Sequence, residues 1–302
     1  MKIGVAYKYS KLDWDMLTTG MSEKELIEHY IKGEQDPKRI ISSHERQKRC
    51  ISTILDKMPE AEIIDIKGIE DSKIKAPDLE TVIAIGGDNF FQKCAYYFPD
   101  AYFVGVNSDP ETSHGALLNF NIESIIGNLE RIRKGDFSVE QWTKIATTVN
   151  DKRYEDTCCT LSLAIKITDM CSRYLLKLGD EREEQKATGI IIVAGAGSGK
   201  RAWYRNAGIY LPQIKSGLYP CITQEFPKTS RELRTLTREP IEGEDSRYRW
   251  LNLTVPDREA LQLNYWSHYP SELSIDSIKR YDIKEGDLLT FRASENRLKV
   301  VN

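Results

Sequence analysis

Short apolar runs alternate with amphipathic stretches over about the first 135 residues, and this alternation limits the possible folds more than any other feature of the chain. The apolar runs predict strands at residues 2–7, 61–66, 81–88 and 102–110. The spacing of apolar residues predicts helices at 45–58, 90–98 and 122–136, the last with Gly135 at its C-cap. Strands that alternate with helices form a parallel sheet, and ligands bind outside the carboxyl ends of its strands. The first part of the chain is therefore predicted to be an α/β domain.

From about residue 140 onward, helical patterns largely disappear and strand-like runs follow one another. These runs are KIATTVN (144–150), TLSLAIKI (160–167), RYLLKL (173–178), TGIIIVA (188–194), WLNLTV (250–255) and LLTFRA (288–293), with turns such as LGDE, IEGED and KEGD between them. They predict a second, mostly-β domain. We expect domains at residues 1–138 and 139–302, and leave open whether the last strands pack back on the first domain.

Charge and hydropathy exclude two classes of partner. The chain of 302 residues carries 43 basic and 46 acidic side chains, so its net charge of −3 gives no electrostatic case for binding nucleic acid or an anionic membrane. No apolar run approaches the roughly 20 residues that a membrane helix needs. The first residues, MKIGVAYKYSK, enter a strand pattern directly without a targeting segment, which suggests a cytoplasmic protein.

The cysteines and histidines do not form a metal-binding pattern. The six cysteines contain no C-x-x-C spacing, and the four histidines are scattered. We therefore expect reduced, buried thiols and no metal site made by protein side chains alone. Cys158 and Cys159 lie in a strand-like stretch, where alternation would send the two side chains to opposite faces.

The segment at residues 10–44 does not fit the simple alternation. A capping box at Ser22 and Glu25 precedes a run of apolar residues at helical spacing. The segment is interpreted as a helical insertion or, alternatively, as a lid that carries lysine and arginine.

The stretch GIIIVAGAGSGKRAW (189–203) resembles a phosphate-binding P-loop only superficially. A P-loop needs G-x-x-x-x-G-K-[ST], but Ala194 replaces the first glycine and Arg201 replaces the hydroxyl residue. A dinucleotide fingerprint also fails, because Lys200 stands at its third glycine. The surroundings are rich in strands rather than arranged as strand, loop and helix, so the P-loop hypothesis is rejected.

A second glycine turn, AIGGDNFFQ (84–92), ends a buried strand and precedes a predicted helix. Gly86 and Gly87 allow a ligand to approach the backbone, and the start of the helix offers N–H groups to an anion. Asp88 is placed to act as a general base on a hydroxyl or to help position magnesium. A plain structural turn is the alternative.

Five motifs, in this order along the chain, resemble the NAD kinase family and its diacylglycerol and sphingosine kinase relatives. GGDN (86–89) is similar to the GGDG motif of these kinases, and VGVNSDPETSHG (104–115) is similar to the GVN segment of the mitochondrial-type NAD kinases. TGIIIVAGAGSGKRAW (188–203), TREPIEG (237–243) and the last strands (274–301) resemble corresponding segments of the same branch.

The resemblance implies an N-terminal Rossmann-like α/β domain, a C-terminal mostly-β domain and an active site in the cleft between them. It implies phosphoryl transfer from ATP, with Mg²⁺, to the 2′-hydroxyl of the adenosine ribose of NAD, giving NADP. Asp88 would be the base, and Gly86 and Gly87 would line the phosphate path. A homodimer or homotetramer would be expected.

The resemblance also implies a set of nucleotide-binding residues. They are Asn89 and Phe90 after the GGD turn, Asn107 and Asp109 after the GVN strand, and Thr188, Ser198, Gly199, Lys200, Arg201, Ala202 and Trp203 in the β domain. For Trp203 a core aromatic is the alternative, and for Lys200 and Arg201 the alternative is a solvent-facing cationic pair.

Two departures from the family pattern leave the acceptor open. Asn89 replaces the last glycine of GGDG and adds bulk and polar groups there. The Asn-Glu/Asp pair that contacts NAD in the family should lie near residues 160–166, which contain no such pair. The alternatives are a kinase of the same fold that acts on a nucleoside, another nucleotide or a lipid, and a non-catalytic nucleotide-binding homologue. The donor, ATP or polyphosphate, is also left open.

Overall fold

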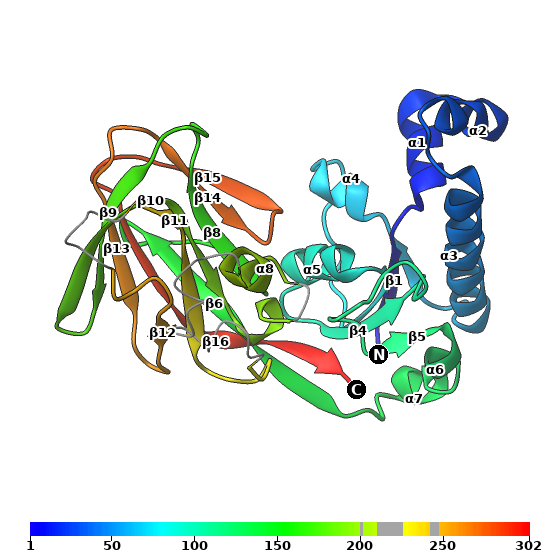
Figure 1. The fold of residues 1–302 in the computed structure, drawn as a ribbon. Helices are drawn as coiled ribbons and strands as arrows, with labels where there is room; N and C mark the ends of the chain where they lie inside the picture. Colours follow the sequence, from blue (N-terminus) through cyan, green and yellow to red (C-terminus); the bar gives the residue numbers. More distant parts are fainter. Residues whose placement is uncertain (200–201, 210–225, 242–247) are drawn as a thin grey trace. The chain divides into compact units, whose positions relative to one another are not determined.

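The computed structural model describes residues 1–199, 202–209, 226–241 and 248–302 (Figure 1). The chain divides into two units, Met1–Glu140 together with Lys299–Asn302, and Gln141–Leu298. We keep the expected domain boundary after residue 138 as a proposal, because this division does not test whether either part folds alone.

The first unit is built on a parallel sheet, as the alternating sequence pattern predicts. Its strands are β1 (Ile3–Tyr7), β2 (Glu62–Ile64), β3 (Thr81–Gly86), β4 (Tyr102–Asn107) and β5 (Phe120–Asn121). The order β2-β1-β3-β4 is parallel throughout, and Lys299 and Val300 of β16 (Leu288–Val301) pair in parallel with the start of β4. Every residue of β3 is buried, so the sheet is covered on both faces at this central strand.

Seven helices belong to the described first unit. They are α1 (Lys11–Thr19), α2 (Glu23–Lys32), α3 (Pro37–Lys57), α4 (Ile66–Glu70), α5 (Asp88–Tyr97), α6 (Ile122–Ile126) and α7 (Leu129–Lys134). The insertion at residues 10–44 is helical, and the predicted capping box forms between Ser22 and Glu25. Leu12, Leu26 and Tyr30 give this insertion a small core of its own, and Figure 1 shows α1 and α2 beyond one end of α3.

Two predicted elements of the first unit are wrong in detail. The single helix expected at residues 122–136 is two helices, because the chain breaks at Gly127 and Asn128; Gly135 is left-handed (φ 73°) at the C-cap as expected. The strand expected at 61–66 ends at Ile64, because the Asp65 carboxylate accepts a hydrogen bond from the Gly68 N–H (3.0 Å) and caps α4.

The second unit is mostly antiparallel β-structure, which confirms the predicted combination of an α/β part and a β part. Its strands are β6 (Val139–Val149), β7 (Lys152–Arg153), β8 (Thr160–Ile165), β9 (Ser172–Leu178), β10 (Glu181–Val193), β11 (Leu233–Pro240), β12 (Thr254–Val255), β13 (Leu261–Tyr265), β14 (Ser271–Ile275), β15 (Lys279–Ile283) and most of β16. The long strand β10 pairs with β9 through its first half and with β8 and β11 through its second half. The strand predicted at 250–255 is wrong for all but its last two residues, Thr254 and Val255.

The described cysteines are free thiols, and Cys50, Cys94, Cys158 and Cys159 are buried. The expectation that Cys158 and Cys159 face opposite sides is wrong. The pair lies in a bend before β8 rather than in a strand, and the two Sγ atoms are 3.6 Å apart. Cys221 lies outside the described residues. No helix in the described part of the chain is long and apolar enough to cross a membrane.

Candidate functional site

The GGDN turn lies where the order of the parallel sheet reverses. The chain runs from β1 outward to β2 and then returns to β3 on the other side of β1. The carboxyl ends of β1 and β3 therefore flank the kind of crevice in which open α/β sheets bind their ligands. Gly86 ends β3, Gly87 is the extended N-cap of α5 (φ −117°), and Asp88 is the first residue of that helix.

The two glycines of this turn have different surroundings. A Cβ atom on Gly86 would lie 3.1 Å from Lys8 and Phe90, so protein atoms already fill that space. Among the described residues, a Cβ atom on Gly87 would meet only the Ser113 hydroxyl, at 3.6 Å. Gly87 thus leaves an open backbone face directly before the N-terminus of a helix, where N–H groups and the helix dipole favour an anion.

The Asp88 carboxylate is half-buried and holds the loop that follows β4. Its Oδ1 accepts a hydrogen bond from the Leu117 N–H (2.8 Å), and its Oδ2 accepts one from the Ala116 N–H (3.1 Å). An ionised carboxylate offers about four lone-pair sites, so two backbone bonds leave capacity for a further proton or hydroxyl. Asp88 can therefore serve as a base while it positions its neighbours.

A cavity of about 790 Å³ opens at the carboxyl ends of β1 and β2 and reaches the start of α5. Its volume falls in the range of roughly 300–1,000 Å³ that is typical of small-molecule sites. The candidates Asn89 and Phe90 line it, whereas Asp88 does not. Its cationic side chains are Lys8, Lys11, Lys67 and Lys93.

Sequence analysis did not single out the lysines of this cavity. Lys8 and Lys11 belong to the run KYSK, which follows β1 directly, and the rule that ligands bind beyond the carboxyl ends of parallel strands would have selected them. Lys93 ion-pairs with Glu70 (2.8 Å), while Lys8 has no ion-pair partner among the described residues.

Asn107, at the end of β4, organises the loop that follows it. Its Nδ2 donates to the Ser113 carbonyl (2.9 Å), and its Oδ1 accepts from the Asp109 N–H (3.1 Å). Gly115 has a φ of +63°, and a Cβ atom there would lie 2.6 Å from Asn107 Nδ2, so this position of the loop requires glycine.

Asp109 is buried and already engaged by protein groups. Arg46 Nε lies 2.6 Å from its Oδ1, and the hydroxyls of Ser43 and Thr112 donate to its Oδ2. Burial alone would raise the pKa of Asp109, but these hydrogen bonds, Arg46 foremost, hold that pKa below its ordinary value. The carboxylate ties α3 to the loop after β4 and stays ionised to do so.

The GAGSG turn of the second unit is filled by protein. Gly195–Gly197 form a 3₁₀ turn, and a Cβ atom on Gly195 would lie 2.2 Å from the Pro227 carbonyl oxygen. The same atom on Gly197 would lie 2.3 Å from the Cys159 carbonyl oxygen. Buried Ser198 donates to the Gly195 carbonyl (2.8 Å) and accepts from the Phe226 N–H (3.3 Å).

These contacts give a better reason against a P-loop than the sequence does. The expected absence of a strand–loop–helix arrangement is wrong, since β10 leads through the turn into α8 (Trp203–Ile209). The glycines instead accommodate the backbone of neighbouring segments. Among the residues of this turn that the structure describes, only Gly199 would place a Cβ atom in open space.

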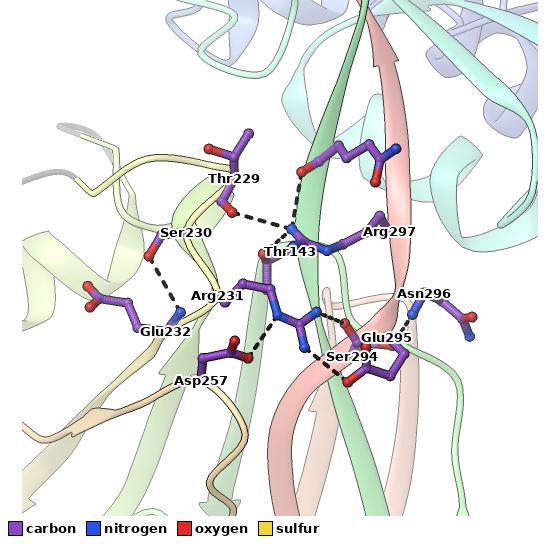
Figure 2. A network of polar contacts seen from close by, with 11 residues as sticks. Thr143, Thr229, Ser230, Arg231, Glu232, Asp257, Ser294, Glu295, Asn296 and Arg297 are labelled. Atoms are coloured by element: carbon purple, nitrogen blue, oxygen red, sulfur yellow. Dashed lines mark hydrogen bonds and ion pairs between the residues drawn. The ribbon is translucent and has the colours of Figure 1, made fainter.

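A polar network fixes the segment that covers Gly195 (Figure 2). Arg231 donates to Asp257 (2.8 Å) and to Glu295 (3.0 Å), and Arg297 donates to the hydroxyl of Thr143 (2.8 Å). The N–H of Thr143 in turn donates to the carbonyl of Lys228 (2.8 Å). The backbone that meets Gly195 is therefore held from β6 and β16 and has little freedom to move aside.

Two motifs of the β region meet around Trp203. Trp203 is 46% exposed, so the core-aromatic alternative is wrong, and the Arg238 guanidinium lies 5.2 Å from its ring centroid. The hydroxyl of Thr188 donates to Glu239 (2.6 Å). Ala202 is half-buried beside them, whereas Lys200 and Arg201 lie outside the described residues.

The segment expected to hold an acidic NAD contact is strand β8. Leu161 and Leu163 are buried in it, and none of its residues is a carboxylate. Elsewhere in the described parts of both units, no three His, Cys, Asp or Glu side chains gather so that they could hold a metal ion.

Comparison with known proteins identifies the fold. No family model matches the chain, and no curated protein matches its sequence. Among solved structures, the crystal structure of an NAD kinase from Archaeoglobus fulgidus in complex with ATP matches with a TM-score of 0.63 and 13% sequence identity. The match covers 100% of this chain and 94% of that chain, so the chain has the fold of that NAD kinase over its whole length.

Proposed function

We propose that this protein is an NAD kinase, which transfers the terminal phosphoryl group of ATP to the 2′-hydroxyl of the adenosine ribose of NAD. The observation that carries the proposal is the GGDN turn. It places the Asp88 carboxylate beside the open backbone of Gly87, at the reversal point of the sheet, in a chain with an NAD kinase fold. The NSDPE segment favours the mitochondrial-type branch of that family.

In the proposed reaction the acceptor hydroxyl attacks the γ-phosphorus, a new P–O bond forms, and the bond to the β-phosphate breaks to release ADP. Asp88 takes the hydroxyl proton, and the N–H groups at the start of α5 face the charge on the transferred group. Because such transfer depends mainly on positioning and charge, one carboxylate with oriented donors suffices.

The residues present fit a magnesium ion that arrives with ATP. Mg²⁺ commonly binds through one or two carboxylates together with substrate phosphates, so a cage of protein ligands is not required. Asp88, with unused acceptor sites next to the phosphate path, is the carboxylate suited to that role. The ion would neutralise charge on the phosphates.

The other nucleotide contacts remain part of the proposal. Exposed Trp203 is suited to touch a ligand directly, and Thr188 is half-buried with its hydroxyl bonded to Glu239. Asp109 and Ser198 are suited to shape the loops around a ligand, since both are buried and already bonded. The side chain of Asn107 is buried and lies at the end of β4, the edge at which parallel sheets bind their ligands. Lys200, Arg201, Gly199 and Ala202, which follow strand β10 of the second unit, stay proposed nucleotide contacts on the strength of the resemblance alone.

The direct test is incubation of the purified protein with ATP, Mg²⁺ and NAD, with NADP measured by an NADP-specific dehydrogenase. We expect NADP to form. The Asp88→Asn variant should lose at least about a hundredfold in kcat, the usual scale of a general base. The matched control is Asp78→Asn, an exposed carboxylate of the same unit.

Asp88 also accepts hydrogen bonds from the N–H groups of Ala116 and Leu117, so its replacement could disrupt the loop after β4. Thermal melting distinguishes such a structural effect from loss of the general base. An Asp88→Asn protein that melts like the wild type but forms no NADP supports the assignment. Full activity in that variant would remove Asp88 from the mechanism.

A second candidate is a kinase of the same fold that acts on another hydroxyl compound. It is favoured by β8, whose buried leucines occupy the segment where an acidic NAD contact is expected. ADP formation with a nucleoside, nucleotide or lipid, but without NADP formation from NAD, would support it. Nucleotide binding without turnover of any acceptor would instead support the non-catalytic alternative.

A further inference from the structure

The cavity beside β1 has an aromatic wall that the proposed chemistry at Asp88 does not use. Tyr9 and Trp14 both line it, with ring centroids 6.4 Å apart and an interplanar angle of 43°. The two side chains are 38% and 43% exposed, so a ligand in the cavity would cover aromatic surface that now faces solvent. Trp14 comes from α1, in the helical insertion whose role the sequence leaves open.

The cavity is lined by four lysines and by four carboxylates, Asp15, Asp65, Glu70 and Asp71. Glu70 and Asp71 pair with Lys93 and Lys73, so Lys8 is the lysine available to an anionic end of a ligand. Lys8 lies against the GGDN turn, since a Cβ atom on Gly86 would be 3.1 Å from the Lys8 Cβ, and Lys8 has no ion-pair partner in the described chain. At the aromatic wall, Lys67 Nζ lies 4.4 Å from the centroid of the Trp14 ring. A molecule with a flat ring and a polyphosphate chain matches both features.

The acidic side chains near the wall are partly committed to the protein. Asp15 accepts hydrogen bonds from Lys11 and from the Tyr30 hydroxyl (2.7 Å), and Asp65 caps α4. Asp65 keeps one oxygen for a further donor, which is what a ribose hydroxyl next to a stacked base would supply.

We propose that this cavity binds the nucleoside end of the phosphoryl donor, a purine nucleoside triphosphate. Its base stacks on Trp14 and makes a tilted contact with Tyr9, whose ring is inclined by 43° to that of Trp14, and its phosphates extend past Lys8 toward the start of α5. The inference rests on the proposed function and deepens it, because it assigns the donor pocket and its specificity residues.

The topology explains why the donor, rather than the acceptor, is placed here. Strand β3 leads into Gly87 and Asp88 and is flanked by β1 on one side and by β4 on the other. Phosphoryl transfer needs donor and acceptor oxygens roughly in line on opposite sides of the transferred group. With the acceptor assigned to the β4 side, where Asn107 lies, the donor falls on the β1 side, which contains the cavity.

Trp14 can be changed without removing what holds α1 in place. The helix is anchored by buried Leu12, by the Ser10 N-cap and by the contact between the Ser10 hydroxyl and His44 (2.7 Å). The Trp14 side chain is outside that core.

The test is quenching of tryptophan fluorescence by a non-hydrolysable ATP analogue, with and without Mg²⁺. Wild type is compared with Trp14→Phe and with the matched control Trp266→Phe, which removes a tryptophan of the other unit with the same 43% exposure. We expect quenching in wild type and in Trp266→Phe, and its loss in Trp14→Phe. Trp14→Ala should raise the Kd of the analogue at least about tenfold, the scale of one stacked base, with the KM for the acceptor changed less than about twofold.

Failure of this inference can be told apart from failure of the proposed function. If the analogue quenches the fluorescence of Trp14 but the enzyme makes no NADP, the donor pocket is supported and NAD is rejected as the acceptor. If NADP forms, but neither quenching nor the KM for ATP depends on Trp14, the donor pocket is elsewhere and the inference is overturned. Equal quenching by inorganic tripolyphosphate and by the ATP analogue would also overturn the inference, because no base would then be recognised.

Discussion

The two glycine turns of this chain look alike in sequence and are used in opposite ways. At the GGDN turn of the first unit, the one group of the described chain near the backbone face of Gly87 is the Ser113 hydroxyl, at 3.6 Å from a Cβ position. At the GAGSG turn of the second unit, the same test places backbone oxygens 2.2 Å from Gly195 and 2.3 Å from Gly197. One turn leaves room for a ligand, and the other is closed by the protein itself.

A buried aspartate supports each turn, and these two carboxylates also differ. Asp109, behind the GGDN turn, pairs with the guanidinium of Arg46, which holds its pKa low against the effect of burial. In the part of the chain that the structure describes, the partners of Asp276 are all backbone groups, the N–H groups of Cys158 (2.6 Å), Cys159 (2.9 Å) and Thr160 (2.8 Å). Burial outweighs those donors and raises the pKa of Asp276 to about 6.

The largest expected effect is on folding, at the closed turn. Gly195→Ala or Gly197→Ala forces a methyl group into a backbone oxygen that the neighbouring segments hold in place. Overpacking typically costs about 1–3 kcal/mol in the free energy of unfolding, and we expect the upper end of that range here because the neighbouring backbone is held in place. Urea denaturation measures the loss, with Gly199→Ala as the control, since its Cβ would meet no atom of the described residues within 4 Å. A wild-type midpoint in either variant would show that the turn is not closed.

The second effect is a pH dependence of the free energy of unfolding that comes from Asp276, which bonds the backbone of Cys159 next to the same turn. Between pH about 4 and 6 the native state holds a proton on Asp276 that the unfolded chain has released, so stability falls as pH rises through this window. A shift from 3.8 to about 6 corresponds to roughly 3 kcal/mol at full burial. Asp109 acts with the opposite sign, and its stabilisation is lost as pH falls through its lowered pKa.

The difference in unfolding free energy between wild type and Asp276→Asn isolates this group from the other carboxylates. Asp276 has a φ of 47°, which asparagine tolerates, so the variant adds little backbone strain. The advantage of wild type over the variant should shrink by about 2–3 kcal/mol from pH 4 to pH 7. A difference that stays constant over that range would mean that the carboxylate titrates at its ordinary value.

Sequence reasoning succeeds where one local pattern decides the structure. The apolar run at residues 81–88 and the periodicity at 45–58 are enough for β3, which ends two residues earlier than predicted, and for most of α3. The Ser22–Glu25 pair is enough for the start of α2. It fails where a distant segment decides. The residues around Gly195 in the sequence do not predict that Pro227 covers it. The residues around Asp109 do not predict its ion pair with Arg46. The cavity at Trp14 depends on the order of the strands, which becomes visible only once β2 and β3 lie on opposite sides of β1.

The smallest expected change in stability is at the open turn, where the change in activity should be clear. In Gly87→Ala the new methyl group makes an ordinary contact at an extended N-cap position, so the free energy of unfolding should change by less than about 1 kcal/mol. The methyl group would occupy the face along which the phosphates pass, so kcat/KM should fall at least about tenfold, or about 1.4 kcal/mol in transition-state stabilisation. Gly127→Ala is the control, because its Cβ is 3.9 Å from the nearest atom at a helix end in the same unit. If Gly87→Ala keeps full activity, the open face is not the phosphate path; if it unfolds like Gly195→Ala, the two turns are not different after all.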